Sequence, residues 1–228
     1  THNHFVLDRG GKVFKQTAPV IKLPAGSSED EHLGLLGLLN SSVACFWLKQ
    51  VCFPKGGDHV GNEGARVRKT LWDERYAINA TNVAEFPLCV GRPLDIATHL
   101  DTQSRQVIAL LPAAVLASDP LPIRTSLDAA RDQVAELRRL MIASQEELDW
   151  RCYQLYGLLP AGVSAEEVEF HAPVEVALGQ RAFEIVLARR VAAGKEQTTW
   201  FERHGSTPIT EIPTHWPEAY RRVVARRI

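Results

Sequence analysis

Basic side chains in the first third of the chain are the residues whose types and spacing could do chemistry with a partner. They are Lys12, Lys15, Lys22, Lys55, Arg66, Arg68, Lys69 and Arg75. Glycines are frequent in the same region, most densely in GGDHVGNEG from Gly56 to Gly64, which predicts a polar surface loop. Lysines and arginines on such loops can neutralise the phosphates of duplex DNA, and an arginine can also read a guanine edge. The pattern therefore predicts a DNA-binding set, with Arg66 and Arg68 as its base-contacting members.

Composition alone leaves a second interpretation of these charges open. They could form a solvated surface whose arginines pair with Asp73 and Glu74, an arrangement that is common on soluble proteins. The formal net charge of the 228-residue chain is -1. This excludes a uniformly basic nucleic-acid arm but is compatible with a local basic face.

No residue pattern predicts catalysis in this chain. The triplet HNH at residues 2–4 has the same letters as the name of the HNH nuclease motif. Adjacent residues on a strand point to opposite faces, however, and cannot converge on one metal ion. The acid pairs Glu29–Asp30, Glu146–Glu147 and Glu166–Glu167 are expected in first helical turns or on exposed helix faces, where acids favour the helix dipole and solubility. The sequence contains no GxSxG, GxGxxG or GxxxxGK[ST] motif, so neither a nucleophile elbow nor a nucleotide loop is predicted.

The cysteines and the apolar runs predict a cytoplasmic protein without a metal site. Cys45, Cys52, Cys89 and Cys152 are scattered, with no CxxC pair, and are expected to be buried reduced thiols. No apolar run reaches the roughly 18 residues that span a bilayer, and no signal peptide is visible. The chain begins at Thr1 without methionine, and we expect it to be part of a longer protein.

The elements that would position the basic residues begin with a strand-like stretch. Apolar and polar residues alternate from Phe5 to Leu23, divided by two adjacent glycines, which predicts a β-hairpin and a third strand over residues 19–23. The apolar run from Leu33 to Val51 is interrupted by LLNSS at residues 38–42. Because Asn and Ser favour helix starts, this predicts either two helices that meet there or one bent helix.

Helices are expected over most of the remaining chain. Hydrophobic spacing and breaker residues predict them over residues 94–110, 127–156, 174–193 and 217–228. The longest has apolar residues at three- and four-residue steps: Leu127, Ala130, Val134, Leu137, Met141, Leu148 and Leu155. The basic residues of the last helix are expected to form a solvated face: Arg221, Arg222, Arg226 and Arg227.

The predicted fold class is α+β, in three parts. A small β-rich or mixed domain occupies residues 1–92, a helical spacer occupies residues 93–159, and a helical C-terminal extension occupies residues 160–228. The basic set lies entirely within the first part.

Several separated phrases of the chain resemble one family in their order. They are IKLP with HLGLLGLLNSSVACFWLKQVCFPKGG (residues 21–24 and 32–57), AEFPL (84–88) and ELDWRCYQLYGL (147–158). These phrases resemble the region after the catalytic domain in type IIG-like restriction-modification enzymes. With FVLDRGGKVF (5–14) and WFERHGSTPITEIPTHWP (200–217), the chain is most similar to the adenine-specific DNA methyltransferases of BREX (Pgl) phage-defence systems.

The resemblance implies a target-recognition portion that binds double-stranded DNA. Its residues 1–92 would grip the duplex and present the target adenine to a methyltransferase domain located before Thr1. S-adenosylmethionine and an NPPY-type motif are expected in that domain, where the adenine is held after base flipping. This chain contains neither NPPY nor a glycine-rich cofactor motif, so no cofactor and no catalytic residue are assigned to it.

A protein-interaction module is the alternative function. In that case the apolar seam from Leu127 to Leu155 and the arginine-rich tail would dock other phage-defence proteins. Salt dependence distinguishes the two functions, because phosphate binding weakens steeply with salt.

Overall fold

The computed structural model describes residues 4–14, 20–55, 75–119 and 121–228. The chain divides into two compact units, residues 1–94 and residues 95–228. The predicted loop over residues 56–64, and residues 15–19 of the predicted strands, lie outside the described residues.

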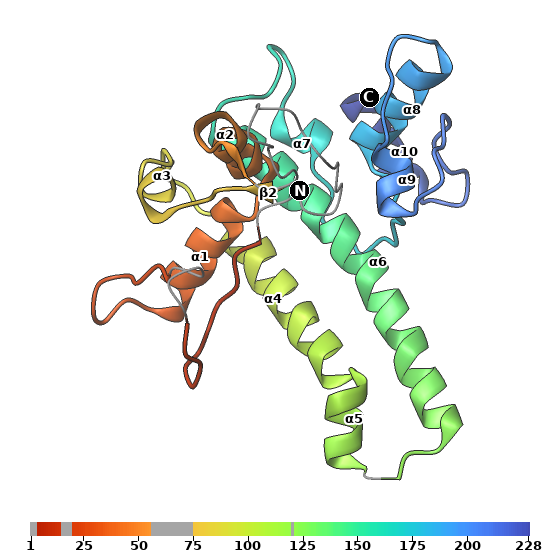
Figure 1. The fold of residues 1–228 in the computed structure, drawn as a ribbon. Coiled ribbons are helices and arrows are strands. Elements are labelled where there is room, and N and C mark those ends of the chain that lie inside the picture. Colours follow the sequence, from red (N-terminus) through yellow and green to blue (C-terminus); the bar gives the residue numbers. More distant parts are fainter. Residues whose placement is uncertain (1–3, 15–19, 56–74, 120) are drawn as a thin grey trace, which may run out of the picture. The chain divides into compact units, whose positions relative to one another are not determined.

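The first unit is built from short helices. They are α1 (Glu29–Leu39), α2 (Ser42–Val51) and α3 (Ala80–Ala84). Strands β1 (Pro54–Lys55) and β2 (Arg75–Tyr76) form an antiparallel pair in which Lys55 lies opposite Arg75. Figure 1 shows these elements in red to yellow.

The predicted α+β class is wrong, because the regular elements of the described residues are all helices except the two-residue strands β1 and β2. Residues 4–14 and 20–23 contain no strand, although their apolar residues alternate. Val6 is 78% exposed and Val13 is 98% exposed. Since an isolated hairpin is stable only when one face packs on other elements, this stretch has nothing to hold it in a sheet.

The junction between α1 and α2 shows the first of the two predicted alternatives, two helices that meet at LLNSS, rather than one bent helix. Asn40 ends α1, and its side-chain amide accepts from the backbone nitrogen of Phe5 and donates to the Phe5 carbonyl, both at 2.9 Å. Ser41 caps α2: its buried hydroxyl accepts from the backbone nitrogen of Ala44 at 3.2 Å. Ser41 therefore satisfies a backbone donor in the first turn of α2, whereas the Asn40 side chain ties the end of α1 to the backbone of Phe5.

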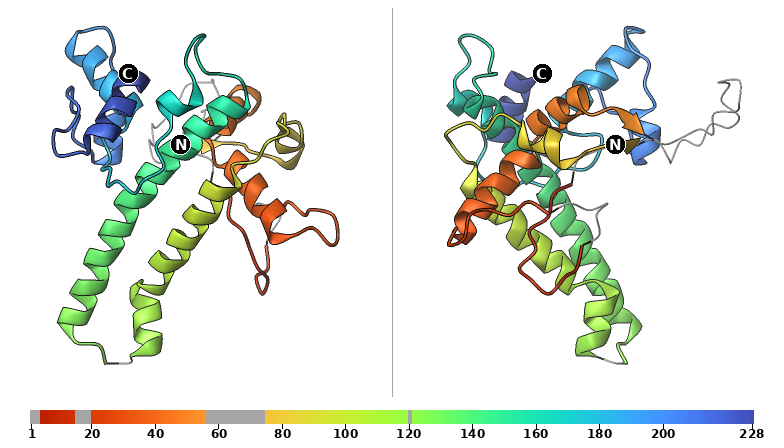
Figure 2. Two further views of the ribbon diagram at one scale, coloured as in Figure 1. Left: turned by 180° about the vertical axis from the view of Figure 1, so that it is seen from behind. Right: turned by 60° about the vertical axis from the view of Figure 1, so that its left-hand side comes forward.

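Helices also form the second unit. They are α4 (Leu94–Ala109), α5 (Pro112–Ser118), α6 (Arg124–Leu155), α7 (Ala165–Val168), α8 (Ala182–Ala192), α9 (Trp200–His204) and α10 (Glu218–Arg227). In both views of Figure 2, α4 and α5 run in one direction and α6 returns in the opposite one. The predicted long helix is thus confirmed as α6, which begins a few residues earlier than expected.

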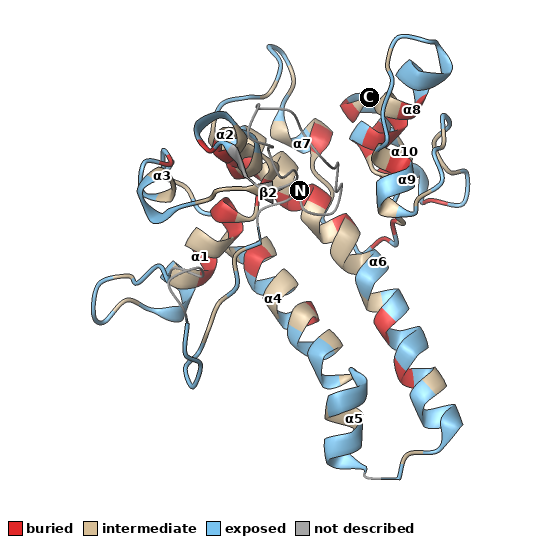
Figure 3. Ribbon diagram, in the orientation of Figure 1, coloured by how far each residue is buried: buried red, intermediate tan, exposed pale blue. Residues whose placement is uncertain are grey.

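The core of the second unit packs the later half of α6 against α8 and α10. Buried residues of this core are Ala143, Val174, Val176, Ala182, Ile185, Trp216, Tyr220 and Val224. Figure 3 shows buried positions gathered on the later part of α6 and on α8 and α10, while α5 and the first turns of α6 are exposed. The predicted helix over residues 174–193 begins only at Ala182, because Val174 and Val176 enter this core from non-helical backbone.

Gly179 provides a test of how closely this core is packed. Its φ is +93°, and a Cβ atom there would lie 2.4 Å from the carbonyl oxygen of Thr207. We expect Gly179→Ala to lower the free energy of unfolding by roughly 2 kcal/mol, because a left-handed conformation and a backbone clash both oppose the added methyl group. Urea denaturation followed by circular dichroism measures the change.

The matched control for this substitution is Gly194, whose φ is +69° but whose added Cβ would meet nothing within 4 Å. Gly194→Ala is expected to cost about 1 kcal/mol, which is the conformational part alone. Equal losses in the two variants would show that the contact with Thr207 does not restrict position 179.

Candidate functional site

The structure describes only part of the predicted DNA-binding set. Lys15, Arg66, Arg68 and Lys69 lie outside the described residues. The backbones of Lys55 and Arg75 face each other across β1 and β2, so the fold brings together two members that are distant in sequence. The DNA-binding prediction itself stays a prediction.

The two remaining members of the set, Lys12 and Lys22, are exposed. The Lys12 ammonium group lies 3.7 Å from a carboxylate oxygen of Asp8. At such a surface position this ion pair contributes little to stability. Lys12 therefore remains accessible to an anionic partner.

A cluster of buried charges in the second unit is the most distinctive polar arrangement in the described part of the chain. We call it the buried charge cluster; its members are Glu146, Glu147, Arg181, Glu184 and Arg227. They come from α6, the start of α8 and the end of α10. The cluster therefore ties together three helices that are far apart in sequence.

Arg227 is at the centre of one half of this cluster. Its side chain is completely buried, and its Nη2 atom donates to Oε2 of Glu147 at 2.6 Å. Its Nη1 atom lies 3.4 Å from Oε1 of Glu146, and its Nε atom donates to the carbonyl oxygen of Val168 at 2.8 Å. The guanidinium group also lies 5.0 Å from the ring centre of Trp150, a cation–π distance. A single arginine thus joins α10 to α6 and α7.

The other half of the cluster is centred on Glu184, which is fully buried. Its carboxylate accepts from the backbone nitrogens of Gly179 and Arg181, at 2.8 and 3.1 Å. It also accepts from the Arg181 guanidinium group and from the indole of Trp200, each at 2.9 Å. Burial opposes ionisation of Glu184, but the hydrogen bonds and charge of Arg181 outweigh it, so its pKa lies below the ordinary value.

Glu146 is held less completely than Glu184. Its Oε1 atom accepts from the backbone nitrogen of Ala182 at 3.1 Å, while no described residue donates a hydrogen bond to Oε2. Burial raises the pKa of Glu146 to about 7, against the opposing charge of Arg227. Burial likewise raises the pKa of the neighbouring Tyr220. A carboxyl group with this pKa changes charge near neutral pH.

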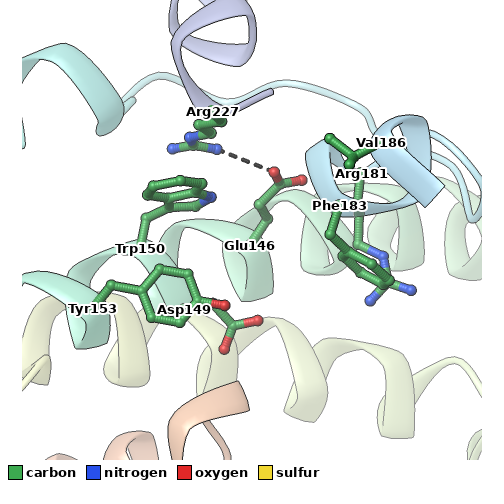
Figure 4. A pocket seen from close by; sticks show the side chains of 8 residues that line it. All are labelled: Glu146, Asp149, Trp150, Tyr153, Arg181, Phe183, Val186 and Arg227. Atoms are coloured by element: carbon green, nitrogen blue, oxygen red, sulfur yellow. Dashed lines mark ion pairs between the residues drawn. The ribbon is translucent and has the colours of Figure 1, made fainter. Parts of the chain in front are cut away.

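A small cavity of about 200 Å³ borders the cluster (Figure 4). Figure 4 shows the Glu146 carboxyl group between the rings of Trp150 and Tyr153 on α6 and that of Phe183 on α8, with Arg227 at one end. The volume is below the roughly 300–1,000 Å³ of ordinary small-molecule sites. Its walls also include no serine, threonine, cysteine or histidine nucleophile. The contacts that border this cavity join α6 to α8 and α10.

The predicted exposure of three residues of this cluster was wrong. Glu146 and Glu147 were expected on an exposed helix face, but both are buried. Arg227 was expected on a solvated face, and only Arg222 and Arg226 of that tail are highly exposed. The arginine that fills the cluster lies 80 positions from Glu147, so no local pattern signals the pairing.

No group of three or more His, Cys, Asp or Glu side chains within the described ranges is placed to hold a metal ion. All four cysteines are free thiols; Cys52 and Cys152 are buried, and Cys45 and Cys89 are half-buried. Across the described helices, none has the length and apolar character needed to cross a bilayer.

Two comparisons with known proteins match this chain, one over part of the second unit and one over its full length. Residues 141–228, which hold the buried charge cluster, match a family model described as a domain of unknown function (DUF7008). The whole chain is 54% identical over 230 residues to the adenine-specific methyltransferase PglX of Streptomyces coelicolor. The match lies in the C-terminal portion of PglX, and the chain spans 19% of the length of that protein. No solved structure matches the chain.

This likeness to PglX confirms the predicted resemblance to adenine-specific methyltransferases. It extends over all of the chain, whereas the phrases that indicated it cover separated segments.

Proposed function

We propose that this chain is the DNA-recognition portion of an S-adenosylmethionine-dependent, adenine-specific DNA methyltransferase of bacterial phage defence. The observation that carries the proposal is the 54% identity to PglX across the entire chain. The parent protein would methylate adenine in duplex DNA. Its first unit would bind that DNA, and its second unit would support the first.

The cofactor and the chemistry belong to a part of the parent outside these residues. The described cavity at Glu146 is smaller than a site for a molecule the size of S-adenosylmethionine requires. No NPPY or glycine-rich cofactor motif occurs in the sequence. The role of this chain is therefore to hold the duplex so that the target adenine can be flipped into a catalytic domain.

Phosphate contacts and base contacts would be divided among the basic residues of the first unit. Lysines such as Lys12 and Lys22, which are exposed, would neutralise phosphates and fix the position of the duplex. Arg66 and Arg68 would read guanine edges, because a guanidinium group can donate two parallel hydrogen bonds to guanine.

The test of this proposal is a map of methylated adenines in DNA from cells that carry the complete parent protein. Replacing Arg66 and Arg68 together with glutamine is expected to relax the methylated sequence at one or more positions, with a loss of about 1–3 kcal/mol per base contact. The matched control replaces Arg138 and Arg222, which lie on exposed helix faces of the second unit. It removes the same charge but should leave the motif unchanged.

Salt titration of DNA binding by the same proteins provides an independent measurement. Each lost phosphate contact should reduce the slope of log affinity against log salt concentration by about one. An unchanged motif and an unchanged slope in the Arg66/Arg68 variant would remove both arginines from the proposed site.

The alternative function, a protein-interaction module, required the apolar seam of α6 and the arginine-rich tail to be exposed for docking. Ala130, Val134 and Leu148 of the expected docking seam are buried within the chain, as is Arg227 of the expected docking tail. These side chains are unavailable to another protein unless the second unit opens. A DNA affinity that does not respond to salt would nevertheless favour that class of function.

A further inference from the structure

The cavity beside Glu146 combines a buried polar atom that lacks a partner with a wall of aromatic rings. Its volume is about 200 Å³, and all of its lining residues belong to the second unit. Figure 4 shows the Glu146 carboxyl group directed into the space between Trp150 on α6 and Phe183 on α8. The cavity is therefore a candidate ligand site formed by residues other than the predicted DNA-binding set.

One oxygen of the Glu146 carboxyl group lacks a hydrogen-bond donor. Glu146 is only 5% exposed. Its Oε1 atom accepts from the backbone nitrogen of Ala182 at 3.1 Å and lies 3.4 Å from Nη1 of Arg227, whereas no described residue donates to Oε2. Because nearly all buried polar groups in proteins are hydrogen-bonded, Oε2 indicates a ligand that carries a donor.

Both arginines that border the cavity are paired with carboxylates outside its walls. Arg181 donates to the two oxygens of Glu184, at 3.1 and 2.9 Å. Arg227 donates to Glu147 at 2.6 Å. Neither Glu184 nor Glu147 lines the cavity.

Carboxyl groups therefore outnumber guanidinium groups around the cavity. Glu146 and Asp149 both line it, in addition to the carboxylates that the arginines hold. An excess of buried carboxyl groups is relieved either by a proton or by a bound cation. The charge of the site thus favours a cationic donor.

The rings of the wall favour an organic cation over a metal ion. The Arg227 guanidinium group lies 5.0 Å from the centre of Trp150, and that of Arg181 lies 4.7 Å from the centre of Phe183, so these rings already stabilise positive charge. Within the described residues, no group of three or more His, Cys, Asp or Glu side chains is placed to hold a metal ion. At roughly 30 Å³ for a group the size of a water molecule, the cavity accommodates about six such groups, so the ligand is short.

We propose that this cavity binds a short primary ammonium group, which donates a hydrogen bond to Oε2 of Glu146 and lies against the rings of Trp150, Tyr153 and Phe183. A free alkylamine and a lysine side chain share this chemistry. The ammonium group competes with the proton of Glu146, because a cation at hydrogen-bond distance favours the ionised carboxylate. Binding therefore tightens as pH rises.

Charged and titratable groups from three elements face Glu146. They are Arg227 and Tyr220 on α10, Arg181 at the start of α8, and Glu147 and Asp149 on α6. Burial opposes the charge of Arg227, but its contacts with Glu147 raise its pKa, and burial raises the pKa of Tyr220, so neither changes charge between pH 6 and 8. Glu146→Gln separates the titration of Glu146 from that of the other carboxyl groups.

Saturation-transfer NMR of n-butylammonium chloride with the complete parent protein tests the proposal. The amine keeps its charge from pH 6 to pH 8, as lysine does. Titrations at these two pH values give its affinity for the unaltered protein, for Glu146→Gln and for the matched control Glu136→Gln, at an exposed position on the same helix. The control ligand is 1-butanol, which has the same carbon chain without the charge.

We expect n-butylammonium to bind the unaltered protein and Glu136→Gln about tenfold more tightly at pH 8 than at pH 6, because the pKa of Glu146 is raised by burial to about 7. Glu146→Gln should bind about tenfold or more weakly at pH 8 and show no such pH response. Phe183→Leu, at a position that is 48% exposed, should lose about two- to fivefold in affinity and keep the pH response. The affinity of 1-butanol should respond neither to pH nor to Glu146→Gln.

A lysine with both its backbone ends blocked distinguishes the two sources of the ammonium group. Tighter binding of blocked lysine than of n-butylammonium would identify the side chain of a protein as the ligand. Weaker binding would identify a free amine.

Absence of saturation transfer at both pH values would overturn the proposal. Equal affinities of Glu146→Gln and the unaltered protein at pH 8, or an affinity that does not depend on pH, would do the same. A loss in Glu146→Gln that 1-butanol shares would show a general apolar site without preference for a cation. DNA is absent from these titrations, so their outcome does not depend on the proposed DNA binding, and the pH response of the unaltered protein is measured without any substitution.

Discussion

Replacing Arg227 with alanine is expected to lower the free energy of unfolding by about 3–5 kcal/mol, the range found when one partner of a buried ion pair is removed. Glu147 would lose the guanidinium group that donates to it at 2.6 Å, and Glu146 would lose its nearest cation. The carbonyl oxygen of Val168 would lose its donor as well. Urea denaturation of the chain, followed by circular dichroism, measures the loss.

The neighbouring Arg226 provides a matched control for this substitution. It lies on the same helix, but its side chain is 69% exposed and 3.7 Å from Glu167, whereas that of Arg227 is completely buried. Arg226→Ala should change the free energy of unfolding by less than about 1 kcal/mol. Similar losses in the two variants would show that the buried charge cluster does not hold α10 in place.

The buried charge cluster could not be predicted from local sequence. Glu146 and Glu147 occur in a helix with many charged residues, and Arg227 occurs among other arginines of the tail. In both places a solvated face is the usual outcome. What distinguishes Arg227 from Arg226 is that it shares a helix face with Tyr220 and Val224, both buried. That spacing is visible in the sequence, although it does not identify the carboxylates that receive the arginine.

Helices were predictable where local chemistry determines them. Ser41 provides a capping group for α2, and Gly157 follows α6 with a φ of +66°, so the start of α2 and the end of α6 follow from local residue preferences. The predicted hairpin over residues 5–23 depended instead on a packing partner. Alternation indicates a strand only when one face can be buried, and Val6 and Val13 remain exposed.

For the predicted DNA-binding set, the sequence could not predict which basic residues lie near one another. Composition identified cations and glycines that suit a phosphate backbone, but composition does not state which of them approach one another. The pairing of β1 with β2 brings the backbones of Lys55 and Arg75 together, a contact between residues 20 positions apart that composition does not indicate. Four members of the set lie outside the described residues.

Stability is expected to decrease as pH rises from about 5 to 8 because of Glu146. The pKa of this carboxyl group is raised from 4.5 to about 7 by burial. The native state therefore holds a proton that the unfolded chain releases above pH 4.5. Glu146 stabilises the fold fully below the unfolded pKa, and this contribution is lost as pH rises through the folded pKa. The difference corresponds to roughly 3 kcal/mol over the whole interval.

Glu146→Gln isolates this effect, because glutamine keeps a carbonyl oxygen for the backbone nitrogen of Ala182 but does not titrate. We expect the variant to be close to the parent sequence in stability at pH 5 and more stable than it at pH 8. Denaturation midpoints measured across this pH range provide the comparison. Glu136→Gln, at an exposed position on the same helix, is the matched control and should retain the slope of the unaltered chain.

The groups that face Glu146 determine whether this slope can be attributed to it. Arg227, Arg181, Glu147 and Tyr220 all influence its charge. Although burial opposes its charge, the pKa of Arg227 is raised by its hydrogen bond and ion pair with Glu147, so Arg227 stays charged in this range. Burial raises the pKa of Tyr220, so its hydroxyl stays neutral. A slope that persists in Glu146→Gln would therefore show that it does not arise from Glu146, and that the Glu146–Arg227 pair remains ionised in the folded chain.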